Sequence, residues 1–397
     1  MRMNDIHDAW GGWYSPFLFP PIKREHPDWL MGTEDKRPVD GAWSAVDYGR
    51  PEVRDLAFQF FEEVCNNYDV DGVEMDFFRH LTYFRKHAWG EPVGQEELDM
   101  MTDLFRRIRT MADEAAVKKG HPILISVRVP DSVELCKAVG FDIERWMAED
   151  LIDIMVVSGY FRLNYWDVSA KLGHKHGVPV YACLSETRMK DAEAHKTRAS
   201  LASYRARAIN AWYGGVDGVY MFNYFNPNSP LWHEVGALDT LAGLDKVYTT
   251  GARGTGNLDF WYTDGERFVN RSLLSPCRAR KLAVGQTETV DLLVGEDLRF
   301  GKGKGESEGE AGAATPKVTL QLRVQDLAKP DDLAVTLNGA QLAGGVQEGL
   351  WVNYALAPAQ VKQGMNRFDI ALNEGAQGSP VLQDLLLWVR YGEAAKP

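Results

Sequence analysis

The chain has 397 residues, of which 45% are apolar and 25% are charged, and its formal net charge is −12. This length favours two domains, because a single hydrophobic core rarely serves so many residues. The excess of acidic residues argues against a nucleic-acid backbone or an anionic membrane as partner. The sequence contains no run of about 18 apolar residues, so no membrane-spanning helix is predicted.

Residues 1 to about 245 alternate strand-like runs with helical segments. The runs are apolar on both faces and lie at 70–77, 122–129, 152–158, 178–184 and 216–222. Helical spacing occurs between them, at 51–67, 95–119, 131–150 and 190–213. This alternation predicts a parallel sheet covered by helices. A doubly wound sheet would need a glycine-rich turn within an early βαβ unit, and none is present, so the sequence favours a (β/α)8-type TIM barrel.

The pattern changes beyond residue 250. Alternating runs separated by Gly, Asn and Pro turns lie at 288–294, 317–324, 332–338, 350–357, 366–372 and 381–391. They predict an all-β sandwich. We therefore expect a barrel over residues 1–248 and a sandwich over 249–397, with low-complexity residues 301–315 as a flexible loop.

The run at 70–77 carries two acidic residues on one face. Side chains alternate along a strand, so Glu74 and Asp76 share the face opposite to Val73, Met75 and Phe77. In a barrel this face points to the interior, and Asp76 lies at the C-terminal mouth, where barrel enzymes place catalytic groups. Glu74 lies deeper and could instead form an ion pair that only holds the fold.

Polar side chains also end the later strands: Arg128, Tyr160, Glu186 and Asn223. Glycosidic cleavage needs one carboxylic acid to protonate the departing oxygen and a second carboxylate to attack the sugar or activate water. Asp76 and Glu186 are the predicted pair. The distance between the two carboxyl groups would distinguish a retaining from an inverting mechanism. The sequence does not show which of the two is the acid and which is the nucleophile or base.

Five motifs stand in order along the first part of the chain: 2–8 (RMNDIHD), 71–80 (DGVEMDFFRH), 126–130 (SVRVP), Asp142 with Trp146, and 217–225 (DGVYMFNYF). Over roughly residues 1–245 they resemble the glycoside-hydrolase-like family 10 proteins. The resemblance implies a TIM-barrel glycosidase acting on an oligo- or polysaccharide, with Asp76 in the catalytic position. The choice of Glu186 rests on its place at a strand end alone.

The C-terminal part also carries a resemblance. Segments 333–339, 351–356 and 362–368 are similar to the jelly-roll, galactose-binding-like modules appended to many glycosidases. Such a module could bind sugar, although bracing of the catalytic domain is the role we expect.

The candidate substrate-binding residues are Asn4, Asp5, His7, Trp10, Glu74, Arg79, His80, Arg128, Tyr160 and Asn223. Trp10 begins an aromatic segment that could stack on sugar rings or pack its own loop down. Arg79, His80 and Arg128 could hold a carboxylated or sulfated sugar, or could pair with Glu74 and Asp76.

Two further functions stay open. One is a barrel that binds glycans without cleaving them. The other is a metal-dependent hydrolase or lyase that uses Asp5, His7 and Asp76, although no complete ligand set is evident and we expect no cofactor. The only Gly-x-Ser-x-Gly match, at residues 305–309, falls in the low-complexity segment 301–315 and does not follow a predicted strand, so a serine esterase is not expected.

Only six strand signals precede residue 245, and the motif at residue 2 follows earlier strands in the family that the chain resembles. We therefore expect a barrel without its first two βα units, explained by a shortened N-terminus or by completion from a partner chain in a homo-oligomer. The first residues lack a signal-peptide core, but a shortened N-terminus would also remove one, so the location stays unknown and export stays open.

Overall fold

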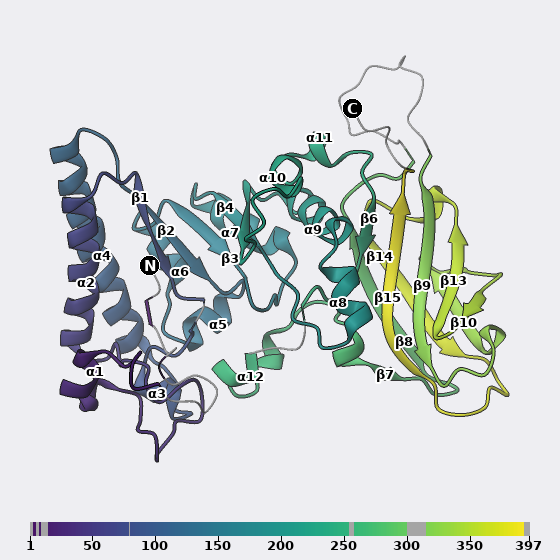
Figure 1. Ribbon diagram of the computed structural model, residues 1–397, viewed down its shortest axis with the longest axis horizontal. Helices are drawn as coiled ribbons and strands as arrows, with labels where there is room; N and C mark the ends of the chain where they lie inside the picture. The colour runs from purple at the N-terminus through teal and green to yellow at the C-terminus, as the bar shows by residue number, and fades with distance from the viewer. Residues whose placement is uncertain are drawn as a thin grey trace. The chain divides into compact units, whose positions relative to one another are not determined.

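The structure, a computed structural model, describes residues 3–4, 8, 15–78, 80–253, 258–299 and 315–392. The chain divides into two compact units. The first unit is Met1–Cys183 with Gly256–Asn270, and the second unit is Leu184–Thr255 with Arg271–Pro397 (Figure 1).

The first unit holds the first strands of the chain and the helices that connect them. Its elements are α1 (Pro21–Glu25), η2 (Pro27–Trp29), α2 (Pro51–Asn67), β1 (Gly72–Asp76), α3 (Arg85–Ala88), α4 (Gln95–Lys119), β2 (Leu124–Val129), α5 (Val133–Ala138), α6 (Ile143–Ala148), β3 (Ile154–Val157), α7 (Trp166–Lys175), α12 (Leu258–Trp261) and η3 (Gly265–Phe268). The chain passes into the second unit within β4 (Val180–Ser185).

The predicted parallel sheet is confirmed. Its strand order is β1-β2-β3-β4-β5, with β5 at Gly218–Phe222, and the β1–β2, β2–β3 and β3–β4 pairs are parallel. These strands correspond to the five apolar runs, and among the described residues the sheet forms part of a barrel and not a full one. The strand predicted at the opening motif lies largely outside the described residues, but the Met3 amide donates to the Asp76 carbonyl at 3.1 Å.

The helix-facing side of β1 is the one that the period-two pattern predicts. Met75 and Phe77 are fully buried, and the Phe77 ring lies 5.7 Å from Phe105 of α4 and 6.0 Å from Trp146 of α6, centroid to centroid. Glu74 and Asp76 are therefore left on the other face of the sheet.

Two long helices match their predicted ranges, and two predicted helices are each divided in two. Helices α2 and α4 cover the expected residues and lie side by side (Figure 1). The predicted helix at 131–150 is interrupted at Gly140, whose φ is 97° and where a Cβ would lie 2.3 Å from the Phe84 ring. The predicted helix at 190–213 restarts at Ser200, whose side chain caps the second helix.

The second unit contains the rest of the helices and two antiparallel sheets. Besides β5, its elements are α8 (Ala192–Arg198), α9 (Leu201–Tyr213), α10 (Leu231–Glu234), α11 (Leu238–Leu241), β6 (Lys246–Tyr248), η4 (Pro276–Arg278), β7 (Arg280–Lys281), β8 (Thr287–Val294), β9 (Lys317–Gln325), η5 (Pro330–Asp332), β10 (Leu333–Leu337), β11 (Ala340–Gln341), β12 (Val346–Glu348), β13 (Trp351–Leu356), η6 (Pro358–Gln360), β14 (Gly364–Leu372) and β15 (Val381–Arg390). All six alternating runs form strands.

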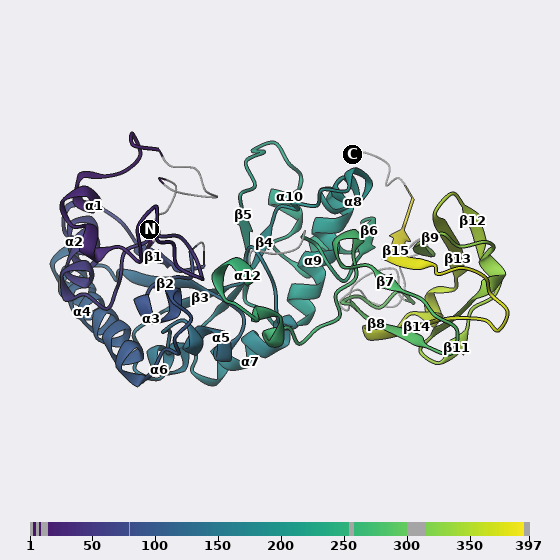
Figure 2. The ribbon, with the colours of Figure 1, turned by 90° about the horizontal axis from the view of Figure 1, so that it is seen from below.

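The antiparallel sheets are arranged as two layers (Figure 2). A four-stranded sheet has the order β11-β10-β14-β8, and a six-stranded sheet has the order β12-β13-β9-β15-β6 with β7 beside β15. Alternate residues of β9 and β14 are buried, as expected when each sheet turns one face to a shared core. Strand β6, from the part of the sequence assigned to the barrel, pairs with β15.

No helix within the described ranges is long and apolar enough to cross a membrane.

Candidate active site

Asp76 and Arg128 form a buried ion pair at the ends of β1 and β2. The parallel register places the two residues opposite each other. Arg128 Nε donates to Asp76 Oδ1 at 2.9 Å and Nη2 donates to Oδ2 at 2.5 Å, while the Phe78 amide donates to Oδ1 at 3.1 Å. The Arg128 side chain is fully buried. Both oxygens of Asp76 therefore accept charge-assisted hydrogen bonds from the same guanidinium.

The groups beside this pair stay protonated. Cys183 Sγ lies 4.0 Å from Arg128 Nη1, yet burial raises the pKa of the thiol to about 12, with Arg128 opposing the shift. Burial, reinforced by Tyr48 and Asp76, also holds the pKa of the Tyr83 hydroxyl well above its usual range. Cys183 is therefore not a thiolate nucleophile.

Four other predicted site residues, Asn4, Glu74, His80 and Tyr160, are described in the first unit. Glu74 is half-buried on the Asp76 face of β1. The buried His80 ring packs edge-on against Trp261 at 5.4 Å, and the buried Tyr160 ring stacks near Phe78 at 6.2 Å, both measured between centroids.

Asn4 has a backbone-holding role in the structure. Its Nδ2 donates to the carbonyls of Val46 at 3.1 Å and Thr82 at 3.0 Å, and its Oδ1 accepts from the Val46 amide at 3.2 Å. The residue is buried. Asn4 therefore ties together the backbones of three segments of the first unit.

The second unit presents Glu186 directly after β4. Its Oε1 accepts from Arg188 Nε at 2.8 Å and from Asn223 Nδ2 at 3.2 Å, and lies 3.8 Å from Arg253 Nη2. Asn223 follows β5 and has a φ of 54°, a left-handed conformation that asparagine tolerates better than most residues. Two predicted site residues, Glu186 and Asn223, are thus in contact.

The second oxygen of Glu186 differs from the first. Within the described part of the chain, Oε2 accepts no hydrogen bond, and 32% of the side chain is exposed. A carboxyl group that is fixed through one oxygen keeps the other for proton transfer or attack, which is the property that an acid, base or nucleophile needs.

Sequence reasoning missed two side chains at this carboxylate. Arg188 lies two residues beyond Glu186, and this short spacing could have indicated it. Arg253 follows 67 residues later and carried no such signal. The structure pairs Asp76 with Arg128 and Glu186 with Asn223.

Four predicted residues, Asp5, His7, Trp10 and Arg79, lie outside the described residues. Among those that the structure does describe, no group of three or more His, Cys, Asp or Glu residues is arranged to hold a metal ion.

A cavity of about 470 Å³ lies elsewhere in the first unit. Its lining is mostly apolar and comes from α2 and the residues around α1, together with Asn4 and the buried Lys23–Asp8 ion pair, whose Nζ and Oδ2 are 2.7 Å apart. Neither Asp76 nor Glu186 lines this cavity.

No protein-family model matches the chain. No curated protein matches it either.

Solved structures that resemble the chain are glycoside hydrolases. A family 18 N-acetylglucosaminidase from Paenibacillus barengoltzii is 18% identical, with 43% of this chain and 55% of that one covered and a TM-score of 0.27. The PgaB (BpsB) glycoside hydrolase domain from Bordetella bronchiseptica is 9% identical, with 50% and 65% covered and a TM-score of 0.34. A family 18 chitinase from Chromobacterium violaceum is 12% identical, with 93% and 76% covered and a TM-score of 0.33. The chain thus spans less than two thirds of the first two structures.

Proposed function

We propose that the chain is a glycoside hydrolase that cleaves an oligo- or polysaccharide with Asp76 and Glu186 as its two carboxylates. The observation that carries the proposal is the asymmetry of Glu186. Its side chain is partly exposed, and its Oε1 is held by Arg188 and Asn223 while its Oε2 takes no hydrogen bond among the described residues. This proposal rests on the carboxylates and not on the solved structures.

The hydrogen bonds support a division of roles between the two carboxylates. Asp76, whose two oxygens both accept from the Arg128 guanidinium, is the carboxylate that stabilises positive charge at the sugar. Glu186 moves the proton through Oε2, giving it to the departing oxygen.

The resemblance to the glycoside-hydrolase-like family 10 proteins supports the same activity and includes the Asp76 motif. Under this proposal residues 1–248 form the catalytic barrel and 249–397 a bracing β-sandwich. The other predicted side chains that would bind sugar are Asp5, His7, Trp10, Glu74, Arg79, His80, Tyr160 and Asn223. Asn4 and Arg128, which were also predicted to bind sugar, are buried and instead hold backbone carbonyls and Asp76.

The experiment uses the full chain on a panel of neutral, amino-sugar and acidic polysaccharides. We expect new reducing ends from at least one of them, and loss of this activity in Asp76→Asn and Glu186→Gln. Glu91→Gln, at an exposed carboxylate, is the matched control. Full activity in both site variants would refute the assignment of the carboxylates. Retention on an affinity gel without cleavage would favour a glycan-binding protein, and loss of activity with a chelator would favour a metal-dependent enzyme.

A further inference from the structure

A continuous line of contacts leads from the six-stranded antiparallel sheet to Glu186. We infer that Asp384, Arg198 and Arg253 are positioning residues that hold the segment Glu186–Asp191 in place from this sheet. The inference rests on the proposed function, because that function requires the Glu186 carboxylate to be held in a fixed position.

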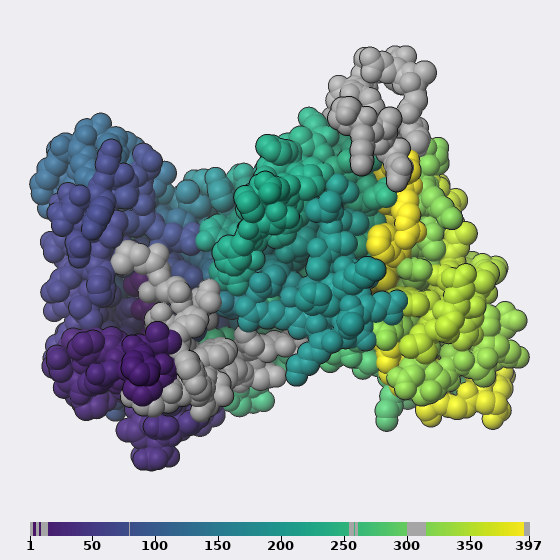
Figure 3. All heavy atoms as spheres, in the orientation of Figure 1, coloured from purple at the N-terminus to yellow at the C-terminus, as the bar shows by residue number. Residues whose placement is uncertain are grey.

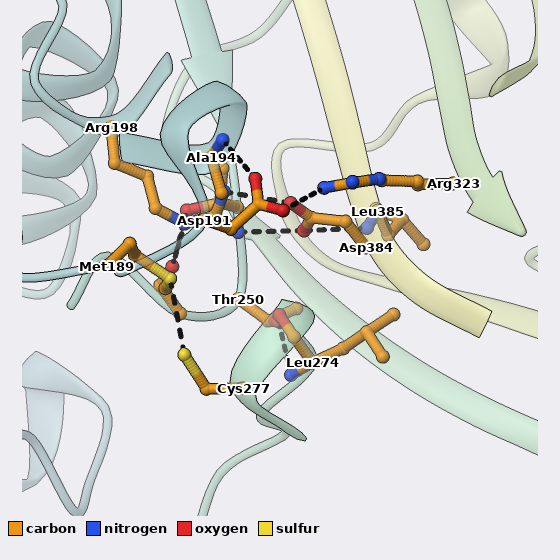
Figure 4. Close-up of polar contacts among 12 residues, drawn as sticks. Met189, Asp191, Ala194, Arg198, Thr250, Leu274, Cys277, Arg323, Asp384 and Leu385 are labelled. Atoms are coloured by element: carbon orange, nitrogen blue, oxygen red, sulfur yellow. Dashed lines mark hydrogen bonds and ion pairs between the residues drawn. The ribbon is translucent and has the colours of Figure 1, made fainter. Parts of the chain in front are cut away.

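The first contact joins β15 to α8 (Figure 4). Arg198 Nη1 donates to Asp384 Oδ2 at 2.8 Å and Nη2 donates to Oδ1 at 2.7 Å, and 0% and 1% of the two side chains are exposed. Asp384 lies at a register shift in β15, and the Leu385 amide donates to its Oδ1 at 2.9 Å. The fork of the guanidinium thus fixes the end of α8 in both distance and orientation.

The same guanidinium continues the line toward Glu186. Arg198 Nε donates to the Gly251 carbonyl at 2.5 Å. Two residues later, Arg253 Nε donates to the main-chain carbonyl of Glu186 at 3.2 Å, and its Nη2 lies 3.8 Å from the Glu186 carboxylate. Arg253 therefore contacts both the backbone and the side chain of the proposed proton donor.

A second line holds the other end of the segment (Figure 4). Asp191 caps α8 by accepting from the Ala194 amide at 2.9 Å, and its second oxygen accepts from Arg323 Nη1 of β9 at 2.9 Å. Next along α8, the Glu193 carboxylate accepts from Trp351 Nε1 of β13 at 2.8 Å. In the space-filling view, the teal atoms of the region around α8 lie directly against the yellow atoms of β15 (Figure 3).

Stability alone is a poor explanation for the buried pair. Removing two charges from water costs free energy, and burial raises the pKa of Asp384 although Arg198 opposes the shift. A well-packed apolar pair would serve a core as well, but it would not fix the direction of a helix end or reach the Gly251 carbonyl. Catalysis does require such precision, because a carboxylate displaced by about 1 Å can lose on the order of 100-fold in rate.

The test compares amide hydrogen exchange over residues 184–191 in the full chain with that in Asp384→Asn and Arg323→Gln. We expect exchange there to become at least about 10-fold faster in both variants, while residues 72–76 and 124–129 keep their wild-type rates. Arg367→Gln, which removes an exposed ion pair with Asp369 on β14, is the matched control and should change nothing in this segment. Arg323 is less buried than Asp384, so its variant keeps the test valid if Asp384→Asn does not fold.

Activity on a cleaved substrate gives a second, separate measurement. We expect kcat to fall by about 10-fold or more in Arg323→Gln with KM within about 3-fold, since a displaced proton donor impairs chemistry more than binding. Unchanged exchange over 184–191 would overturn the inference whatever the activity. An inactive wild-type chain whose variants still show faster exchange would refute the proposed function and leave the positioning contacts supported.

Discussion

At the scale of single residues, the two carboxylates differ in how many of their oxygens are occupied. Asp76 has both oxygens bound by Arg128, whereas Glu186 has one oxygen without a hydrogen bond within the described residues. If Glu186 protonates the leaving group, Glu186→Gln should lose about 10²- to 10⁴-fold on an ordinary glycoside. It should lose far less on an aryl glycoside whose phenolate leaves without a proton. The measurement is kcat/KM on the two substrates.

Asp76→Asn serves as the contrast in that experiment. Its loss should be similar on both substrates, because charge at the sugar must be stabilised whatever the leaving group. An equal loss on both substrates for Glu186→Gln as well would contradict the role of Glu186 in proton transfer.

A second prediction concerns a buried histidine of the first unit. His87 Nε2 donates to the Trp261 carbonyl at 2.7 Å, and burial lowers the pKa of His87 from 6.5 to about 4, against the effect of that bond. As the pH falls below 6.5, His87 becomes protonated in the unfolded chain, whereas in the folded chain it stays neutral until about pH 4. Stability is therefore present above pH 6.5 and is lost toward pH 4, by up to about 3 kcal/mol.

Urea unfolding between pH 7 and pH 4 measures this loss. His87→Gln keeps an amide donor for the Trp261 carbonyl and should flatten the dependence, whereas substitution of the exposed His233 should leave the wild-type slope. Burial also raises the pKa of the neighbouring Asp40. His87→Gln leaves Asp40 in place, so the difference between the two proteins reports His87. A variant with the wild-type slope would show that another group causes the loss.

Much of this residue-scale detail follows from the two-residue alternation of side chains along a β-strand. Alternation along the strands predicts that Asp76 and Arg128 lie on one face near the strand ends, and the parallel register then makes them partners. The bond between Glu186 and Asn223 joins the ends of two predicted strands. Arg253 could not be predicted as a contact of Glu186, because it lies outside any strand or helix and nothing in its sequence neighbourhood specifies its path.

At the scale of elements, close packing between α7 and β4 depends on Gly173. A Cβ at this position would lie 2.3 Å from Val180 Cγ2 and 2.6 Å from the Val178 carbonyl oxygen. Gly173→Ala should therefore cost about 2 kcal/mol of stability despite the better helix propensity of alanine. Gly236→Ala, where a Cβ meets open space, is the control. Equal unfolding midpoints for the two variants would show that α7 can move away without cost.

Helices and strands were most predictable where one hydrophobic periodicity continues over many residues. Helices α2 and α4 have continuous amphipathic patterns, and their ends match the sequence. The division between α5 and α6 depends on the close approach of Gly140 to Phe84, a tertiary contact that periodicity does not contain. Strands β6, β7, β11 and β12 have two or three residues each, too few for a period to be recognised.

At the scale of the whole molecule, the largest departure from the sequence pattern is in the second unit. The sequence places a boundary near residue 248, where helical spacing is lost, yet β6 at Lys246–Tyr248 pairs with β15. Buried ion pairs join the same regions: Arg198 with Asp384, and Lys246 with Glu296 at 2.9 Å. These partners are separated by up to 186 positions in the chain, so local composition cannot indicate them.

The contacts within the second unit predict how the chain responds to division at residue 248. A fragment of residues 1–248 would expose the fully buried guanidinium of Arg198 and the buried Lys246 ammonium without their carboxylate partners. Uncompensated charges of this kind cost about 3–5 kcal/mol each where they stay buried, so the segment from α8 to β6 should unfold locally and the fragment should lose cooperative thermal unfolding. Expression of residues 249–397 as a second chain should partly restore cooperative unfolding, because this chain supplies Asp384, Glu296 and β15. A fragment that unfolds cooperatively at the temperature of the full chain would instead show that the first 248 residues fold independently of the antiparallel sheets.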